Sequence, residues 1–194
     1  MAVTRLITAD DASVLAKLQQ ANRAFLAPWS PRREPAHYTV QGQRRAIADA
    51  LVAYARGTVL PHVILCDGEV VGRVTLSDIR HGTFESCHVG YWLSESHNGR
   101  GLATAAVSEI LDIAFDELGL HRVEAGTIPS NVRSQAVLER NGFVRFGLAP
   151  SYLRIDGEWR DHILYQVLRE SRDRGARSAA ALVDGAQRIQ RSEP

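Results

Sequence analysis

The chain has 194 residues, of which 45% are hydrophobic and 23% charged, and its 23 basic and 22 acidic residues give a formal charge of +1. This composition excludes a disordered or fibrous protein. The charge balance disfavours direct nucleic-acid binding, which usually needs a clearly basic surface. No apolar run approaches the roughly 18 residues of a membrane span and the first residues lack a signal-peptide pattern, so we expect a cytoplasmic protein that does not contact membranes.

The two cysteines, Cys66 and Cys87, each lie in an apolar, strand-like run. We predict that they are free, half-buried thiols, and not a disulfide or a catalytic group. No Cys-x-x-Cys or His-x-x-x-His pair occurs, so the sequence gives no support for a metal site.

The first third of the chain is predicted to form a strand, a helix, a proline-rich structured loop and a second helix. In chain order these cover residues 3–7, 11–21, 22–38 and 39–56. Thr8 or Asp10 is the expected cap of the first helix, and Gly57 is the expected end of the second.

The rest of the chain alternates strands with two helices. Asp67-Gly68 and Asp156-Gly157 each separate two runs rich in strand-forming residues, which predicts two β-hairpins. The other elements expected here are a strand over 85–93, a helix over 102–118, a strand over 121–128 and a helix over 131–140. The helix between two neighbouring strands makes one parallel crossover.

The predicted fold class is therefore α+β, with a mixed, mostly antiparallel sheet of about seven strands flanked by about four helices. We expect a single domain over residues 1–170. Residues 171–194 are rich in Arg, Ala and Ser, and we expect them to be a C-terminal appendage.

The segment 98–103 lies between a strand and a long helix and contains Gly-x-Gly. Small residues there allow a ligand close to the backbone, and free amides at the positive end of a helix favour a phosphate or pyrophosphate. Neither a Walker loop nor a complete Gly-x-Gly-x-x-Gly fingerprint is present, because Thr104 stands at the third glycine position.

Several segments in this order resemble the Gcn5-related N-acetyltransferases (GNAT), and within them the ribosomal-protein-alanine N-acetyltransferases of RimJ and RimL type. The core of the resemblance is a strand ending Gly-Tyr-Trp-Leu, the Gly-x-Gly loop, Arg-Val-Glu-Ala, Asn-x-x-Ser and a helix ending Asn-Gly-Phe. Further support comes from residues 22–31, 80–91 and 152–164. The resemblance covers residues 3–168.

The resemblance implies a GNAT fold and acetyl-CoA as co-substrate, without a metal. It implies that Trp92 and Leu93 pair with the pantetheine arm through their backbone and that Asn131 binds the arm from the other side. The pyrophosphate would lie on the backbone amides of Asn98, Gly99, Arg100, Gly101, Leu102 and Ala103. The family signature usually opens with Gln or Arg where this chain has Asn98.

The implied reaction is direct attack of an amine on the thioester. Ser134, at the start of the short helix, is the predicted donor to the leaving thiolate and also contacts the cofactor. An α-amine has a pKa near 8, so it needs only a weak base. Glu85 is the first candidate for that base, and His88 is the second; both precede the Gly-Tyr-Trp-Leu segment.

The expected acceptor is the N-terminal α-amine of a protein, with a ribosomal protein as the family-like partner. The residues expected to contact it are Phe25, Trp29, Tyr38, Glu124 and His162, although Glu124 is equally placed for a simple ion pair with Arg122. Two alternatives stay open: acetylation of a small amine such as an antibiotic or polyamine, and a non-catalytic acyl-CoA-binding or ribosome-assembly module. The sequence is compatible with a monomer or a homodimer.

Overall fold

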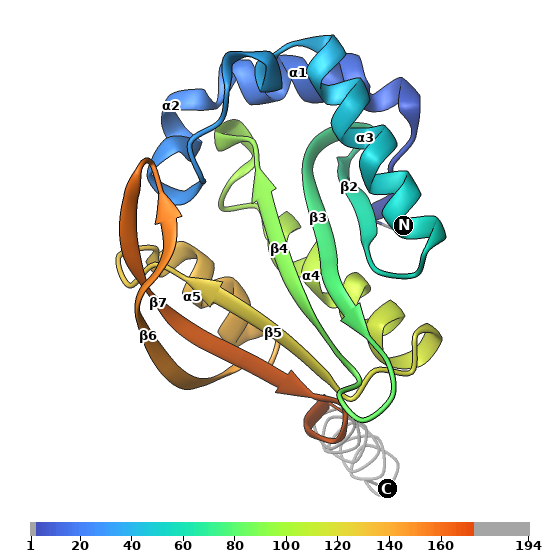
Figure 1. The fold of residues 1–194 in the computed structure, drawn as a ribbon, viewed down its shortest axis with the longest axis vertical. Helices are drawn as coiled ribbons and strands as arrows, with labels where there is room; N and C mark the ends of the chain where they lie inside the picture. Colours follow the sequence, from blue (N-terminus) through green and yellow to red (C-terminus); the bar gives the residue numbers. More distant parts are fainter. Residues whose placement is uncertain (1–2, 173–194) are drawn as a thin grey trace, which may run out of the picture.

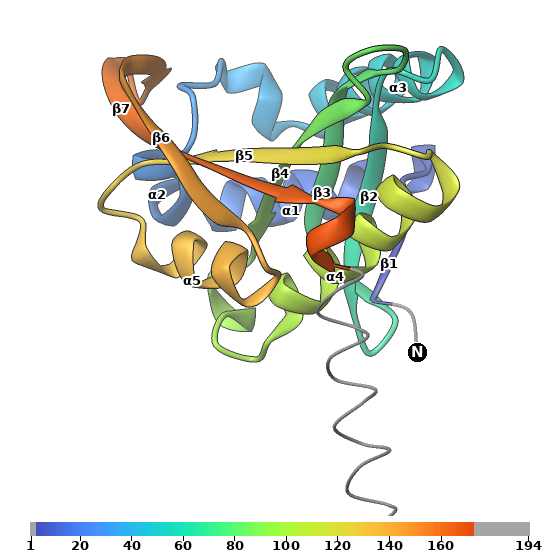
Figure 2. The same cartoon turned by 90° about the horizontal axis from the view of Figure 1, so that it is seen from below.

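A seven-stranded mixed sheet forms the centre of the molecule, with helices on both faces (Figure 1; Figure 2). The computed structural model describes residues 3–172. The strand order is β1-β2-β3-β4-β5-β7-β6, and only β4 and β5 pair in parallel. The predicted α+β fold with a single parallel crossover is confirmed.

The elements in the described residues are seven strands and five α-helices. The strands are β1 (Thr4–Leu6), β2 (Leu60–Cys66), β3 (Glu69–Arg80), β4 (Ser86–Leu93), β5 (Arg122–Thr127), β6 (Val144–Ile155) and β7 (Glu158–Leu168). The α-helices are α1 (Ala12–Ala21), α2 (Arg23–Leu26), α3 (Val40–Ala55), α4 (Leu102–Asp112) and α5 (Val132–Arg140). Short 3-10 turns occur at η1 (Ala9–Asp11), η2 (Ala27–Trp29), η3 (Pro35–Tyr38) and η4 (Glu95–His97), and α4 continues as a π-helical turn, η5 (Ile113–Glu117).

The segment 22–38, predicted as a structured loop, is divided into α2, η2 and η3. Pro28 and Pro35 lie in the first turns of η2 and η3, where a missing backbone N–H costs nothing. Both hairpin turns are confirmed, with positive φ at the Asp and at the Gly of each turn. Of the expected appendage, residues 173–194 lie outside the described part of the chain.

Alternation along β4 directs successive side chains to opposite faces of the sheet. Cys87, Val89 and Leu93 pack with α4 in the larger core cluster. Trp92 packs on the other face, where α1 and α3 contribute Leu15 and Ile47 to a second cluster. Both cysteines are free, and burial raises the pKa of Cys87 to about 12.

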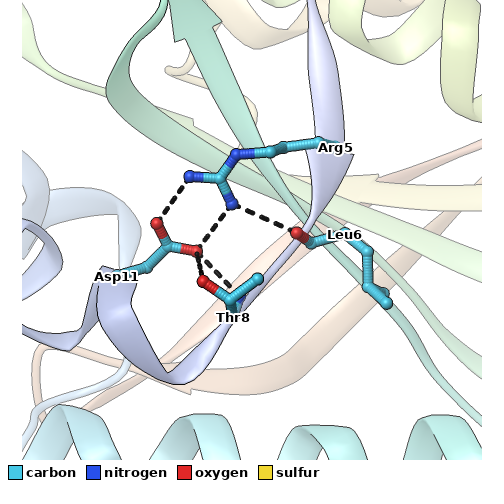
Figure 3. A network of polar contacts seen from close by, with 4 residues as sticks. All are labelled: Arg5, Leu6, Thr8 and Asp11. Atoms are coloured by element: carbon cyan, nitrogen blue, oxygen red, sulfur yellow. Dashed lines mark hydrogen bonds and ion pairs between the residues drawn. The ribbon is translucent and has the colours of Figure 1, made fainter.

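A buried carboxylate fixes the start of α1 (Figure 3). Asp11 accepts hydrogen bonds from both terminal nitrogens of Arg5, at 2.8 and 2.7 Å, and from the backbone N–H and hydroxyl of Thr8. Burial alone would raise the pKa of Asp11, but the hydrogen bonds from Arg5 and Thr8 outweigh it and lower that pKa. The network joins β1 to α1 and so positions the helix over the sheet.

The two parallel strands separate soon after they meet. β4 and β5 pair only from Ser86 with Arg122 to His88 with Glu124. Beyond that point β4 pairs only with β3, and β5 pairs only with β7. Figure 1 shows the two strands diverging from their common end, so that their backbones form a V.

No helix within residues 3–172 is long and apolar enough to span a lipid bilayer.

Candidate active site

Two cavities meet at β4, one reaching β5 and the other reaching β3. One, here called the α5 cavity, has a volume of about 690 Å³ and extends from β4 to β5 and α5. The other, the α1 cavity, has a volume of about 740 Å³ and lies under α1, α2 and η3. The residues common to both are Leu26, Ser30, Gly90, Tyr91 and Trp92. Two ligand-sized spaces therefore meet along the part of β4 that β5 does not pair.

The α5 cavity gathers most of the residues predicted to bind the cofactor. Its lining includes Trp92, Leu93, Asn98, Ala103, Asn131 and Ser134. Three residues predicted to bind the acceptor, Phe25, Trp29 and His162, line the same cavity. Gly99, Arg100, Gly101 and Leu102 are not in its lining but connect Asn98 to Ala103 at its edge.

The loop before α4 has the geometry of an anion-binding turn. Gly99 and Gly101 both have φ of +77°, a left-handed conformation that favours glycine, and Gly101 is the N-cap of α4. A Cβ at either position would meet nothing within 4 Å, so the backbone angle and not crowding requires glycine. The first amides of α4 have no helical acceptor and point outward with the positive end of the helix dipole.

Asn131 and Ser134 form the start of α5. Asn131 is the N-cap, and its side-chain oxygen accepts a hydrogen bond from the Ser134 N–H at 3.1 Å. The Ser134 hydroxyl lies 2.9 Å from the hydroxyl of Tyr91, which also lies 3.2 Å from the Ser134 carbonyl oxygen. The two hydroxyls are thus held together across the V, from β4 and from α5.

Tyr91 is a site residue that the sequence reasoning missed. Burial raises its pKa to about 12, and the contact with Ser134 opposes this only in part. Its phenol therefore stays protonated at neutral pH and acts as a hydrogen-bond donor. The alternation of β4 was the available signal, because it places Tyr91 on the same face as Val89 and Leu93.

The structure does not place the two predicted bases in a cavity. Glu85 is exposed, precedes β4 with φ of +39°, and contributes its carbonyl oxygen to the backbone N–H groups of His121 and Arg122. His88 lies at the closed end of the V, with Nε2 at 3.4 Å from a carboxylate oxygen of Glu124. Neither lines the α5 or the α1 cavity.

Of the two roles expected for Glu124, acceptor contact or an ion pair, the structure shows the ion pair. Its carboxylate lies 3.4 Å from Arg122 as well as from His88, and it lines neither cavity. His162 is different: it is buried, lines the α5 cavity and packs against the Tyr152 ring. Its Nδ1 lies 3.0 Å from the Arg160 carbonyl oxygen, so in the tautomer that donates this bond Nε2 is free to accept a proton.

The α1 cavity has a different lining. Tyr38, predicted to contact the acceptor, lies in it beside His37, and the Arg23 guanidinium stacks 4.6 Å above the Tyr38 ring. The buried Gln43 side chain donates to the His37 carbonyl oxygen at 2.6 Å and ties η3 to α3.

Comparisons with known proteins agree with this geometry. Residues 3–144 match the acetyltransferase (GNAT) domain family. The chain belongs to the GNAT acetyltransferases.

Individual relatives match along most of their length. The chain is 37% identical over 166 residues to "Probable N-acetyltransferase YjcK" of Bacillus subtilis, covering 84% of this chain and 92% of the relative. It is 32% identical over 164 residues to the [ribosomal protein uS5]-alanine N-acetyltransferase of Escherichia coli, covering 84% of each.

One solved structure that is similar to this chain contains a CoA compound. Mycobacterium smegmatis RimJ in complex with CoA-disulfide superimposes with a TM-score of 0.84 at 36% identity, covering 86% of this chain and 81% of that one. The RimJ/RimL-like character expected from the sequence is confirmed.

Proposed function

We propose that this acetyltransferase transfers the acetyl group of acetyl-CoA to the N-terminal α-amine of a protein, with ribosomal proteins as the acceptor class. The observation that carries the proposal is the junction of the two cavities at Gly90, Tyr91 and Trp92. A thioester held in one cavity and an amine entering from the other would meet there. The similarity to the uS5-alanine N-acetyltransferase supports the choice of acceptor.

The loop Asn98–Ala103 and the first turn of α4 would hold the pyrophosphate, because both glycines free the amides for an anion. Beyond His88, β4 has no strand partner across the V within residues 3–172, so the backbone of Trp92 and Leu93 offers hydrogen bonds to the amide groups of the pantetheine arm. Asn131 lies on the opposite wall of the α5 cavity. The cofactor itself supplies an activated acyl group.

Ser134 and Tyr91 would assist the leaving group. As the amine nitrogen bonds to the carbonyl carbon and the C–S bond breaks, charge develops on sulfur. When Tyr91 donates to the Ser134 hydroxyl oxygen, the Ser134 hydroxyl proton is free to point at that sulfur. A CoA thiol resembles a cysteine thiol, with a pKa near 8.5, so one good donor is sufficient.

His162 is the proposed acceptor of the amine proton, through Nε2 and a bridging water. Glu85 and His88 stay predictions, and either would have to act from the closed end of the V. A pH–rate profile separates the three. The peptide amine, with a pKa near 8, gives an acidic limb of kcat/KM in every variant. We expect the additional steepness from an enzyme base to disappear in His162→Gln and to survive in Glu85→Gln and His88→Gln. Loss of that additional steepness in Glu85→Gln alone would return the role to Glu85.

The test of the proposed function is acetyl transfer to two acceptor pools, read by mass spectrometry. One pool holds peptides with Ala, Ser or Met at the N-terminus, including ribosomal-protein N-termini, and the same peptides with a blocked α-amine as the control. The other pool holds polyamines and aminoglycosides. We expect product on free peptide α-amines only. Product confined to the small amines would overturn the proposed acceptor and keep the acetyltransferase.

A further inference from the structure

The α1 cavity is lined by four arginines and only one acidic residue. The arginines are Arg23, Arg32, Arg33 and Arg73, and the acid is Asp156, at the tip of the β6–β7 hairpin. Within residues 3–172 none of the four guanidinium groups has a carboxylate within ion-pair distance. This is unusual, because arginine in a cavity is normally paired with an anion.

Arg73 is the most enclosed of the four. It lies on β3, its Nε is buried, and that Nε has no hydrogen-bond partner in the described part of the chain. Burial lowers the pKa of Arg73, and the neighbouring Arg33 lowers it further. An arginine nevertheless stays protonated in proteins, so the described residues leave a partly buried charge without a compensating carboxylate.

The neighbouring groups show the same positive field. The pKa of His37 is lowered, first by burial and then by Arg33 and Arg73. Arg23 is held in place over Tyr38 and keeps its guanidinium edge for a further partner. A site with this charge fits a bound oxyanion.

The sheet register limits the distance from this charge to the reacting centre. The two cavities meet along Gly90–Trp92, where Arg73 pairs with Trp92 and Thr75 pairs with Gly90. Arg73 is therefore level with one end of the junction and about 7 Å along β3 from the other, since a strand rises about 3.4 Å per residue. An extended peptide rises by a similar amount, so an anion near Arg73 would belong to one of the first four residues.

On the basis of the proposed function, we propose that the α1 cavity selects protein N-termini that carry Glu or Asp within their first four residues, with Arg73 and Arg33 binding the carboxylate. Charge complementarity identifies this occupant. The positive wall does not oppose the chemistry, because the nucleophile is the neutral amine and nearby positive charge favours that form.

The test compares octapeptides that begin with Ala and differ only by Glu or Gln at position 2, 3 or 4. Removal of a charge-assisted hydrogen bond corresponds to about a tenfold loss, so we expect at least one Gln peptide to have kcat/KM about tenfold lower than its Glu partner. The difference should fall with added salt, because the arginines on the segment 22–38 are exposed.

Enzyme variants locate the selection. Arg73→Met removes the charge and keeps the alkyl stem. Arg33 is exposed, so Arg33→Gln removes a charge without disturbing the core. Both should remove most of the Glu-over-Gln preference. Arg45→Gln, an equal charge change on an exposed position of α3 outside the cavity, is the control and should keep the preference. Arg33→Glu should shift the preference toward Lys peptides.

The outcomes separate this inference from the proposed function. Equal kcat/KM for Glu and Gln peptides at all three positions would overturn the selection and leave N-terminal acetylation standing. Transfer to no peptide at all would overturn both. Transfer confined to a small amine that carries a phosphate, tested with phosphoethanolamine, would assign the arginines to a small-molecule acceptor and overturn the peptide.

Discussion

The α5 cavity and the α1 cavity lie on either side of the same strand, yet they are made from different chemistry. The α5 cavity relies on backbone: a glycine loop, a helix N-terminus and the open edge of β4. The α1 cavity relies on side chains, above all four arginines, three from the segment 22–38 and one from β3. A backbone site recognises a ligand common to a whole family, whereas a side-chain site can be changed residue by residue. This difference fits the proposed function, in which the α5 cavity holds the cofactor and the α1 cavity selects the acceptor.

The largest expected effect tests the chemistry of the α5 cavity. Ser134→Ala should lower kcat by about tenfold or more, because the leaving sulfur loses its donor, while the Kd for acetyl-CoA changes little. Rapid-quench kinetics and calorimetric titration measure the two quantities separately. Unchanged turnover would remove Ser134 from the mechanism.

Gly101→Ala should weaken acetyl-CoA binding by changing the backbone of the glycine loop in the α5 cavity. A left-handed φ costs a non-glycine residue about 1–2 kcal/mol, so the Kd for acetyl-CoA should rise by about tenfold as the loop distorts. Gly57→Ala is a matched control, because Gly57 has a φ of +72° and open space around it but lies at the end of α3. Equal Kd values for the two variants would show that the loop does not bind the pyrophosphate.

Tyr91→Phe removes one oxygen and should lower kcat by about fivefold, because Ser134 then has to be oriented without its partner. The effect should be small in a Ser134→Ala background, since the two act as a unit. With the Tyr91 pKa raised to about 12, the wild-type enzyme should lose no activity to tyrosinate formation below about pH 11. Additive effects of the two substitutions would contradict the pairing.

Gln43→Leu should change only the α1 cavity. Without its hydrogen bond to the His37 carbonyl, η3 is less firmly placed, and the KM for the acceptor peptide should rise by about threefold. Acetyl-CoA binding, measured in parallel, should be unaffected. A matching rise in the Kd for acetyl-CoA would mean that the two cavities are not independent.

The smallest effect on catalysis is expected for Asp11→Asn, which lies outside both cavities. It should leave kcat and KM unchanged and lower the free energy of unfolding by about 1 kcal/mol, allowing for the half-exposed Arg5. Because the folded-state pKa of Asp11 is lowered, this stability is present above the unfolded-state value near 3.9 and is lost as pH falls through the folded value. Denaturant unfolding at pH 7 and at pH 3 should show a smaller difference in the free energy of unfolding between wild type and Asp11→Asn at pH 3.

Many residues that line the α5 cavity could be predicted from the sequence, because they belong to motifs within short stretches of the chain. A glycine pair before a helix and an Asn three residues before a Ser are visible in a short stretch of chain, and so were the hairpins and the crossover. Tyr91 and Ser134 are 43 residues apart, so their contact depends on the fold. The arginines of the α1 cavity come from segments that have no shared motif, and the short turns of 22–38 are too brief to show helical periodicity.

The short pairing of β4 with β5 also has a consequence for amide exchange. Only three residue pairs join the strands on one side of the V to those on the other, and the facing backbone edges beyond His88 and Glu124 have no partner strand in the described chain. Within Val89–Leu93, the amides that face β3 are paired, whereas deuterium should enter the amides that face away from β3 early in the free protein, although β4 lies at the centre of the sheet. A bound pantetheine arm should slow uptake at those amides, so one edge of a central strand would be protected by a ligand and not by the polypeptide.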